Sequence, residues 1–220
     1  MVTLGKNKTI QIEPWKTKAK RDFMKRIKEK GEKFTEDDLL ETLVYPYIEP
    51  KDIYLNEDEV QYVITNIRNI SINDKLSFNI ECSSCYETIS VDTDILDLCE
   101  YQENSYPIET DGIVWKDLSS KKSLEKICKE YPDDLPSDLE MLLHIKEYKG
   151  KEITSFAEIM EIVDEFTLQD NEDLYNHYDK VKSKFTISKD IVCMKCNSSD
   201  TYEFESIPGF FEPLLPPDMR

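Results

Sequence analysis

Two pairs of cysteines are the residues of this chain whose type and spacing could do chemistry. Each pair has the C-x-x-C spacing: Cys82 with Cys85, and Cys193 with Cys196. A tight C-x-x-C turn aims both sulfurs at one point, and four thiolates hold Zn²⁺ in a tetrahedron with Zn–S distances of about 2.3 Å. The sequence therefore predicts one structural Zn²⁺ site with these four cysteines as its ligands.

Strand-like runs flank both pairs. Leu76–Glu81 alternates apolar and polar residues before the first pair, and Tyr86–Val91 does so after it. Phe185–Val192 precedes the second pair, and Thr201–Glu205 follows it. This alternation is typical of β-strands, so each pair is expected at the turn of a hairpin. The predicted module is zinc-ribbon-like and discontinuous, built from residues 75–92 and 185–207.

Other interpretations of the cysteines stay open at this point. The four could be buried free thiols of a lost metal site, or they could form a disulfide. The residue after the second cysteine of such a turn favours a left-handed backbone, which Asn197 tolerates and Tyr86 would adopt only with strain. The remaining thiols, Cys99 and Cys128, are expected to be small core residues.

Charge is unevenly distributed along the 220 residues. The net charge is −18, but residues 1–33 carry 11 Lys and Arg against 4 Asp and Glu. A chain this acidic repels nucleic acid over most of its surface, so nucleic acid is an unlikely partner. The basic start of the chain either contacts an acidic partner or folds back on the acidic remainder.

The ends and hydropathy of the chain give expectations about location. Residues 1–11 are polar and lack the apolar core of a signal peptide, and no apolar run approaches the ~20 residues of a membrane span. We therefore expect no membrane span and a reducing compartment such as the cytoplasm, which favours zinc over disulfides.

Helical periodicity dominates outside the hairpins, so the predicted fold class is α+β: a helical body with two C-x-x-C hairpins. After a short strand at Thr9–Ile12, amphipathic patterns predict helices over Trp15–Lys30, Thr35–Val44 and Asn56–Ile67. Beyond the first hairpin, Ser137–Tyr148 is one of several further segments predicted to be helical, with a strand expected at 112–115.

The predicted organisation is one compact unit spanning 1–220. The last segment is rich in proline, which prevents a regular helix, so it should lie extended on a surface, covered by the chain's own core or by a neighbour. The predicted parts are a basic strand–helix arm (1–33), the two hairpins, a helical insertion (93–184) and the extended tail (208–220). The predicted partner contacts are Trp15, Lys18 and Arg21 in the arm and Phe210, Phe211, Leu214 and Leu215 in the tail.

Catalytic motifs are lacking in the sequence. His144 and His177 are the two histidines, and the chain has no zinc-protease, nucleophile-elbow, Walker or dinucleotide-binding signature. A thiol oxidoreductase would place the first cysteine of C-x-x-C at the start of a helix, whereas both pairs here lie between expected strands. We therefore expect no enzymatic activity and no small-molecule substrate.

The order of these elements resembles a known family. The elements are the Trp- and Lys-rich helix at 15–31, Leu55–Glu59 opening a helix that ends at Arg68, a C-x-x-C hairpin running into Val91–Asp94, and a second such hairpin followed by Gly209-Phe210-Phe211. This arrangement resembles the baseplate hub and hub assembly proteins of T-even-type contractile-tailed bacteriophages. The similarity spans nearly the whole chain and is carried most specifically by the cysteine pairs and the Gly-Phe-Phe.

The resemblance implies a structural or assembly role in a viral tail. The expected partners are phage tail and baseplate proteins, and the expected location is the virion or, during assembly, the host cytoplasm. The alternative from the residues alone is a zinc-ribbon adaptor that binds nucleic acid or the transcription machinery, which the basic start of the chain permits.

Overall fold

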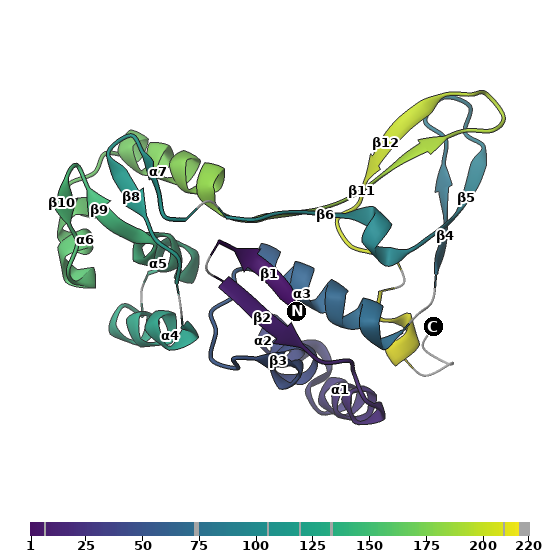
Figure 1. Ribbon diagram of the computed structural model, residues 1–220, viewed down its shortest axis with the longest axis horizontal. Coiled ribbons are helices and arrows are strands. Elements are labelled where there is room, and N and C mark those ends of the chain that lie inside the picture. Colours follow the sequence, from purple (N-terminus) through teal and green to yellow (C-terminus); the bar gives the residue numbers. More distant parts are fainter. Residues whose placement is uncertain are drawn as a thin grey trace.

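The computed structural model shows an elongated molecule of mixed helix and sheet (Figure 1). A central body carries the chain start, a second lobe of helices and short strands lies at one end, and two hairpins project at the other. The structure describes residues 1–6, 8–72, 75–104, 106–118, 120–132, 134–208 and 210–215.

The central body is organised around one long helix. α3 (Glu57–Ser71) begins at a capping box in which the Asn56 side chain accepts from the backbone N–H of Glu59 and the Glu59 side chain accepts in return. Its apolar residues at i, i+3, i+4 and i+7 are buried in the first hydrophobic core, as the pattern predicted. The body also contains β1 (Val2–Gly5), β2 (Lys8–Ile12), α1 (Thr17–Lys30), α2 (Glu36–Leu39), a π-helical turn (Leu40–Val44) and β3 (Ile48–Glu49).

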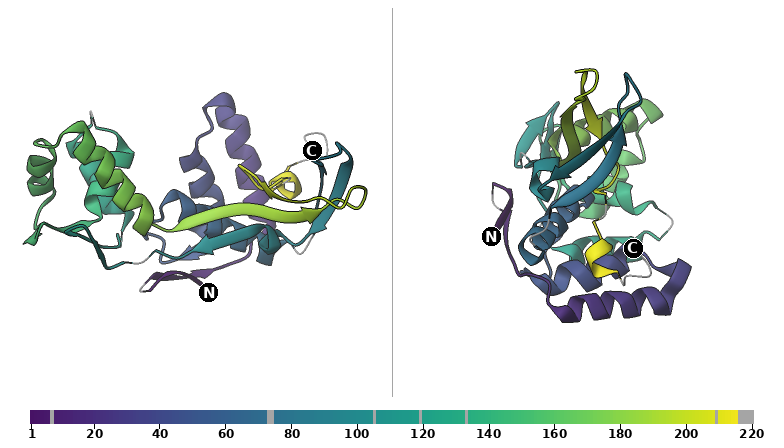
Figure 2. Two further views of the ribbon diagram at one scale, coloured as in Figure 1. Left: turned by 90° about the horizontal axis from the view of Figure 1, so that it is seen from above. Right: turned by 90° about the vertical axis from the view of Figure 1, so that its right-hand side faces the viewer.

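Both predicted hairpins are present and stand side by side at one end of the molecule (Figure 2). β11 is shared: its first half, Lys184–Ile187, pairs with β6, and its second half, Ser188–Val192, pairs with β12. The strands are β4 (Leu76–Glu81) with β5 (Thr88–Thr93), and β6 (Cys99–Gln102) with β11 (Lys184–Val192) and β12 (Ser199–Glu203), with a 3₁₀ turn at Ile95–Leu98 between the two groups.

The second lobe has its own hydrophobic core around the fully buried Trp115. A four-stranded antiparallel sheet in the order β10-β9-β8-β7 packs there with three helices, α5, α6 and α7, and α4 packs against α5. The elements are β7 (Ile108–Thr110), β8 (Ile113–Trp115), α4 (Lys121–Glu130), α5 (Pro136–Leu143), β9 (Ile145–Tyr148), β10 (Lys151–Glu152), α6 (Phe156–Val163) and α7 (Leu168–Val181).

The sheet corrects the expectation of a helical insertion over 93–184. The helix predicted for Ser137–Tyr148 ends at Leu143, and Ile145–Tyr148 is a strand instead. The reason lies in two turns that demand positive φ: Asp111-Gly112 joins β7 to β8, and Lys149-Gly150 joins β9 to β10, with φ of 47°, 80°, 49° and 79° along the chain. Such turns match the twist of paired strands and commit their flanks to hairpins.

Polar groups are buried where the second lobe meets the body. Lys8 Nζ lies 2.7 Å from Glu59 Oε2 and 3.4 Å from Asp117 Oδ1. His144 lies against the rings of Tyr54 and Tyr106, and its Nδ1–H donates to the Lys116 carbonyl at 2.8 Å. Burial lowers the pKa of His144 to about 4, so the imidazole is neutral in the fold.

We predict that acid destabilises the second lobe through His144. The pKa is lower in the folded state (about 4) than the ordinary 6.5, so the stabilisation is complete above pH 6.5 and is lost as the pH falls toward 4. The largest loss is roughly 3 kcal/mol, at about 1.4 kcal/mol per pKa unit. Urea unfolding at pH 7 and pH 4.5 measures it. His144→Gln, which does not titrate, should show a smaller decline, and an equal decline in both proteins would contradict the assignment.

Candidate metal centre

The two C-x-x-C turns have the same backbone structure. In the first, Cys82 N–H donates to Glu87 O at 2.9 Å and Tyr86 N–H donates to Cys82 O at 2.9 Å. In the second, the matching bonds are Cys193 N–H to Ser198 O at 2.9 Å and Asn197 N–H to Cys193 O at 2.8 Å. The residue after each second cysteine is left-handed, with φ of 58° at Tyr86 and 59° at Asn197, as the spacing predicted. A non-glycine residue there costs about 1–2 kcal/mol, so Tyr86 is strained.

The four sulfurs of these turns converge on one point. Cys82 Sγ lies 3.7 Å from Cys196 Sγ, Cys85 Sγ lies 3.7 Å from Cys193 Sγ, and all four lie within 4.8 Å of one another. A disulfide would bring two sulfurs to about 2.05 Å. Four bonds of about 2.3 Å to a tetrahedral centre would instead separate the sulfurs by about 3.8 Å. The spacing therefore fits a shared metal ion, and all four cysteines are free.

The electrostatics of the cluster also suit a cation. The Ser198 hydroxyl lies 3.3 Å from Cys82 Sγ and, with backbone N–H groups, lowers the pKa of Cys82 to about 6. The same hydroxyl lowers the pKa of Cys196. At Cys85 the backbone N–H of Glu87 favours the thiolate, but burial and the facing thiols raise the pKa to about 12. Neighbouring thiolates repel one another, so a bound dication is what would let all four ionise.

Three further contacts tie the two hairpins together near the cluster. Ser83 Oγ donates to Asp200 at 2.5 Å, Tyr202 Oη donates to the Glu81 carbonyl at 3.1 Å, and Lys195 forms an ion pair with Glu87. The sequence reasoning identified neither these pairs nor Ser198. The signal for Ser198 was its place two residues after Cys196, where its hydroxyl can reach the sulfurs.

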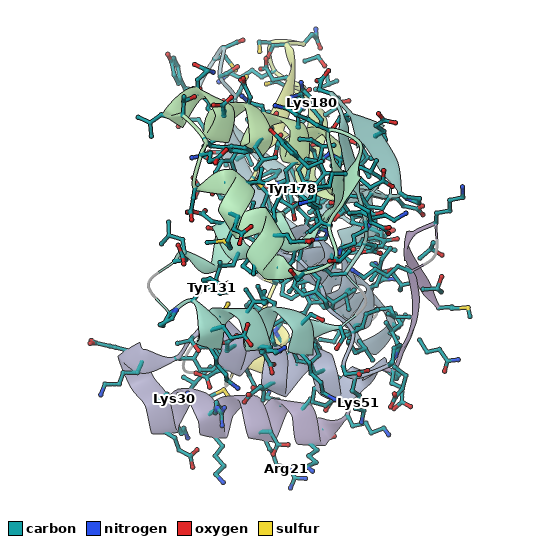
Figure 3. The ribbon with its side chains drawn as sticks, turned by 90° about the vertical axis from the view of Figure 1, so that its left-hand side faces the viewer. Arg21, Lys30, Lys51, Tyr131, Tyr178 and Lys180 are labelled. Atoms are coloured by element: carbon teal, nitrogen blue, oxygen red, sulfur yellow. The ribbon has the colours of Figure 1, made fainter. Side chains whose placement is uncertain are left out.

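The predicted contacts of the basic arm divide into covered and outward-facing side chains. Trp15 is half-buried, and its indole N–H donates to Leu43 O at 2.8 Å. Lys18 and Arg21 are exposed on α1, and Arg21 points away from the body (Figure 3). Further along α1, Arg26 and Lys30 each lie 2.7 Å from the Asp38 carboxylate. Part of the basic arm therefore folds back on the acidic body, and part faces solvent.

Arg26, Lys30 and Asp38 form a charge cluster. The ammonium of Lys30, together with hydrogen bonds from Thr35 and Arg26, holds the pKa of Asp38 well below its usual range. The Thr35 hydroxyl in turn accepts from the Asp38 N–H at 3.4 Å. Thr35 and Asp38 therefore form a capping box at the start of the helix predicted from Thr35, and Asp38 also anchors the end of α1.

The chain's own core covers the tail. Phe210 and Leu214 are buried in the first core, with Phe211 and Leu215 packed against it. Arg68 Nε–H donates to Phe210 O at 3.0 Å, and Lys20 donates to the carbonyls of Pro213 and Leu215. The expected extended shape is wrong for Glu212–Leu214, which forms a 3₁₀ turn. Gly209 and 216–220 lie outside the described residues, and the partner-binding role of the four apolar tail residues stays a prediction.

The fold and the site define a mixed helix-and-sheet protein in which two distant hairpins close one four-cysteine cluster. A family model described as T4 bacteriophage base plate protein matches residues 1–212. The chain therefore belongs to that family, and the resemblance to baseplate proteins of T4-type phages is confirmed. No curated protein and no solved structure matches the chain. None of the helices among the described residues is both long and apolar enough to cross a membrane.

We predict that Phe210→Ala destabilises the body. Phe210 is 8% exposed. Its ring lies edge-on to the rings of Trp15 and Phe211, and Phe211 in turn stacks on Phe23. Removing a buried Phe side chain costs about 3–5 kcal/mol, because it leaves a cavity. Urea unfolding measures the change. Leu168→Ala is the control, since Leu168 is 90% exposed and its truncation should change stability by no more than about 0.5 kcal/mol. Equal stability of Phe210→Ala and wild type would mean that the tail is not core.

Proposed function

We propose that this protein is a non-enzymatic structural or assembly component of the hub region of a contractile-tail baseplate, held in shape by a structural Zn²⁺ ion. The observation that carries the proposal is the combination of a baseplate family match over residues 1–212 with a four-cysteine cluster closed between distant hairpins. A structural role needs a rigid shape rather than a reactive group, and a closed four-cysteine site would provide that rigidity.

Zinc is the ion that the donor set favours. Four thiolates in a tetrahedron are typical of structural Zn²⁺ sites, which are closed and leave no open position for substrate. Cys82 and Cys193 are buried, Cys85 is half-buried and Cys196 is exposed. The ion would make the two hairpins one zinc-ribbon-like module and fix the ends of the segment between them.

Binding to other tail proteins falls to the surfaces that the fold leaves open. On α1, the outward-facing Lys18 and Arg21 suit an acidic partner surface. The apolar tail would act indirectly, by holding α1 in place through Lys20. In this proposal the chain divides into the basic arm, the hairpin module, the inserted lobe and the tail.

Nucleic-acid binding by the hairpins is disfavoured by their charge. Around the cysteines, residues 81–90 and 190–203 carry five carboxylates against one lysine. Nucleic-acid affinity depends on neutralising phosphates with Lys and Arg, so this module would repel a phosphate backbone. The zinc-ribbon adaptor is therefore the weaker candidate.

For the zinc centre we predict about one Zn²⁺ per chain, lost in Cys196→Ser. This ligand is exposed, so its replacement removes a metal bond with little loss of packing. The variant should melt at a lower temperature, and chelation should lower the melting temperature of the wild type but not that of Cys196→Ser. Elemental analysis and calorimetry measure both. Cys128→Ser is the matched control, because the same replacement on α4 should leave zinc bound. A zinc-free wild type whose melting is unchanged by chelators would refute the proposal.

For the baseplate role we predict that a phage lacking this protein fails to complete its tails. Supplying the wild type or Cys128→Ser from a plasmid should restore tail assembly, whereas Cys196→Ser should restore it poorly, because the hairpin module is loosened. Electron microscopy of lysates and phage titre measure the outcome. Immunoblots of purified tails then separate a retained component from an assembly factor. Normal tails without the protein, together with strong binding to duplex DNA at physiological salt, would favour the adaptor instead.

A further inference from the structure

The tip of the hairpin module presents large apolar side chains to solvent. Met194 is 89% exposed, Tyr86 is 74% exposed and Val192 is 53% exposed. They share one end of the molecule, because Tyr86 follows Cys85 and Met194 follows Cys193, and the sulfurs of these two cysteines are 3.7 Å apart. In the part of the chain that the structure describes, no hydrogen bond or ring contact engages the Tyr86 phenol.

The fold itself gives no reason for Tyr86 or Met194. Tyr86 has φ of 58°, a conformation that suits Gly or Asn, and the matching position of the second turn is Asn197 with φ of 59°. Met194 corresponds to Ser83 in the first turn, which shows that a small polar residue also fits there. Backbone strain combined with an exposed ring is a feature of binding sites rather than of folding.

Charge defines what the tip can contact. Five carboxylates flank it, and its one lysine, Lys195, is paired with Glu87. An apolar knob with an acidic flank fits a shallow apolar hollow with a basic rim. A partner surface without positive charge would leave the negative charge of these carboxylates without a counter-charge at the interface.

The same chain carries a hollow of that kind on the solvent-facing side of α1. Its volume is about 430 Å³, and its lining includes Met24, the cations Lys20, Arg21, Lys25 and Lys28, and Glu29, which pairs with Lys25 at 3.7 Å. Four cations against one carboxylate leave the lining basic. α1 and the tip lie on opposite sides of the molecule in Figure 1 and in the right-hand view of Figure 2. One copy therefore cannot bring its own tip onto its own α1.

We propose that the tip of one copy seats on α1 of a second copy, in a head-to-tail contact between Tyr86 and Met194 on one side and the Met24 hollow on the other. Such a contact is heterologous, so it continues from copy to copy until a ring closes or a filament forms. The tip owes its shape to the proposed zinc centre, and the inference rests on that part of the proposed function.

Self-association of the zinc-loaded full chain is the first measurement. Sedimentation velocity over a range of protein concentrations should show species larger than a monomer. They should weaken at about 1 M salt, where charges are screened beyond about 3 Å. A wild type that is monomeric at every concentration overturns the proposal.

Two double variants test the geometry. Tyr86→Gly with Met194→Ser removes the knob while keeping residues that suit the turn, and Arg21→Glu with Lys25→Glu reverses the rim of the hollow. Each variant alone should be monomeric. An equimolar mixture should form a 1:1 dimer and nothing larger, because only one intact tip and one intact hollow meet in each pair. Leu168→Ser, which removes an equally exposed apolar side chain from the second lobe, should associate like the wild type.

The other outcomes overturn the inference. A tip variant that still associates, or a mixture that stays monomeric, excludes the head-to-tail contact. Loss of association in the tip variant but not in the α1 variant would indicate a symmetric contact between two tips instead. Zinc content is measured on every variant, so that loss of the head-to-tail contact can be told from loss of the metal centre. A variant that keeps one Zn²⁺ and no longer associates has lost only the contact.

Discussion

The convergence of four sulfurs is the constraint on which the rest of the structure depends. Cys85 and Cys193 are 108 residues apart in sequence, and Cys82 and Cys196 are 114 apart. Closing so long a segment costs chain entropy. The ion pair and hydrogen bonds between the hairpins are exposed, and such contacts contribute about 1 kcal/mol or less each. A metal bound by four thiolates contributes far more, so it would be the dominant link between the hairpins.

This link acts on the whole molecule through β11. The end of β11 that pairs with β12 carries the turn at Cys193, while its beginning, Lys184–Ile187, pairs with β6. β6 leads into the second lobe and β11 returns from it, so these two strands are the neck of that lobe. Fixing the far end of β11 at the cysteine cluster therefore also fixes the neck. Lys8, which pairs with Glu59 inside the body, also lies 3.4 Å from Asp117 and so links the body to the second lobe on the other side.

Local signals made the cysteine site and the core of the body predictable from sequence. The C-x-x-C pairs, the alternating runs beside them and the left-handed positions at Tyr86 and Asn197 each depend on residues within one turn of the chain. The capping box at Asn56 is equally local. What the sequence did not contain was the pairing of β6 with the start of β11, which joins segments about 80 residues apart and leaves no periodic signature. The turn at Asp111-Gly112 precedes the strand expected at 112–115, whereas the helical pattern over Ser137–Tyr148 obscures the strand that leads into Lys149-Gly150.

The tail shows why the remaining choice lay beyond the sequence. Its prolines exclude a regular helix, and its apolar residues demand cover, but burial against the chain's own core and burial against a neighbour remove the same apolar area from water. The two kinds of burial differ in which groups bond the backbone carbonyls of the tail. A proline-rich segment cannot form a regular helix or sheet, so its carbonyls need donors from elsewhere. In the structure Arg68 donates to the Phe210 carbonyl, and Lys20 donates to those of Pro213 and Leu215. Because these donors come from α3 and α1 of the same chain, residues 210–215 close over the chain's own core, while Lys18, Arg21 and Lys25 of α1 remain exposed.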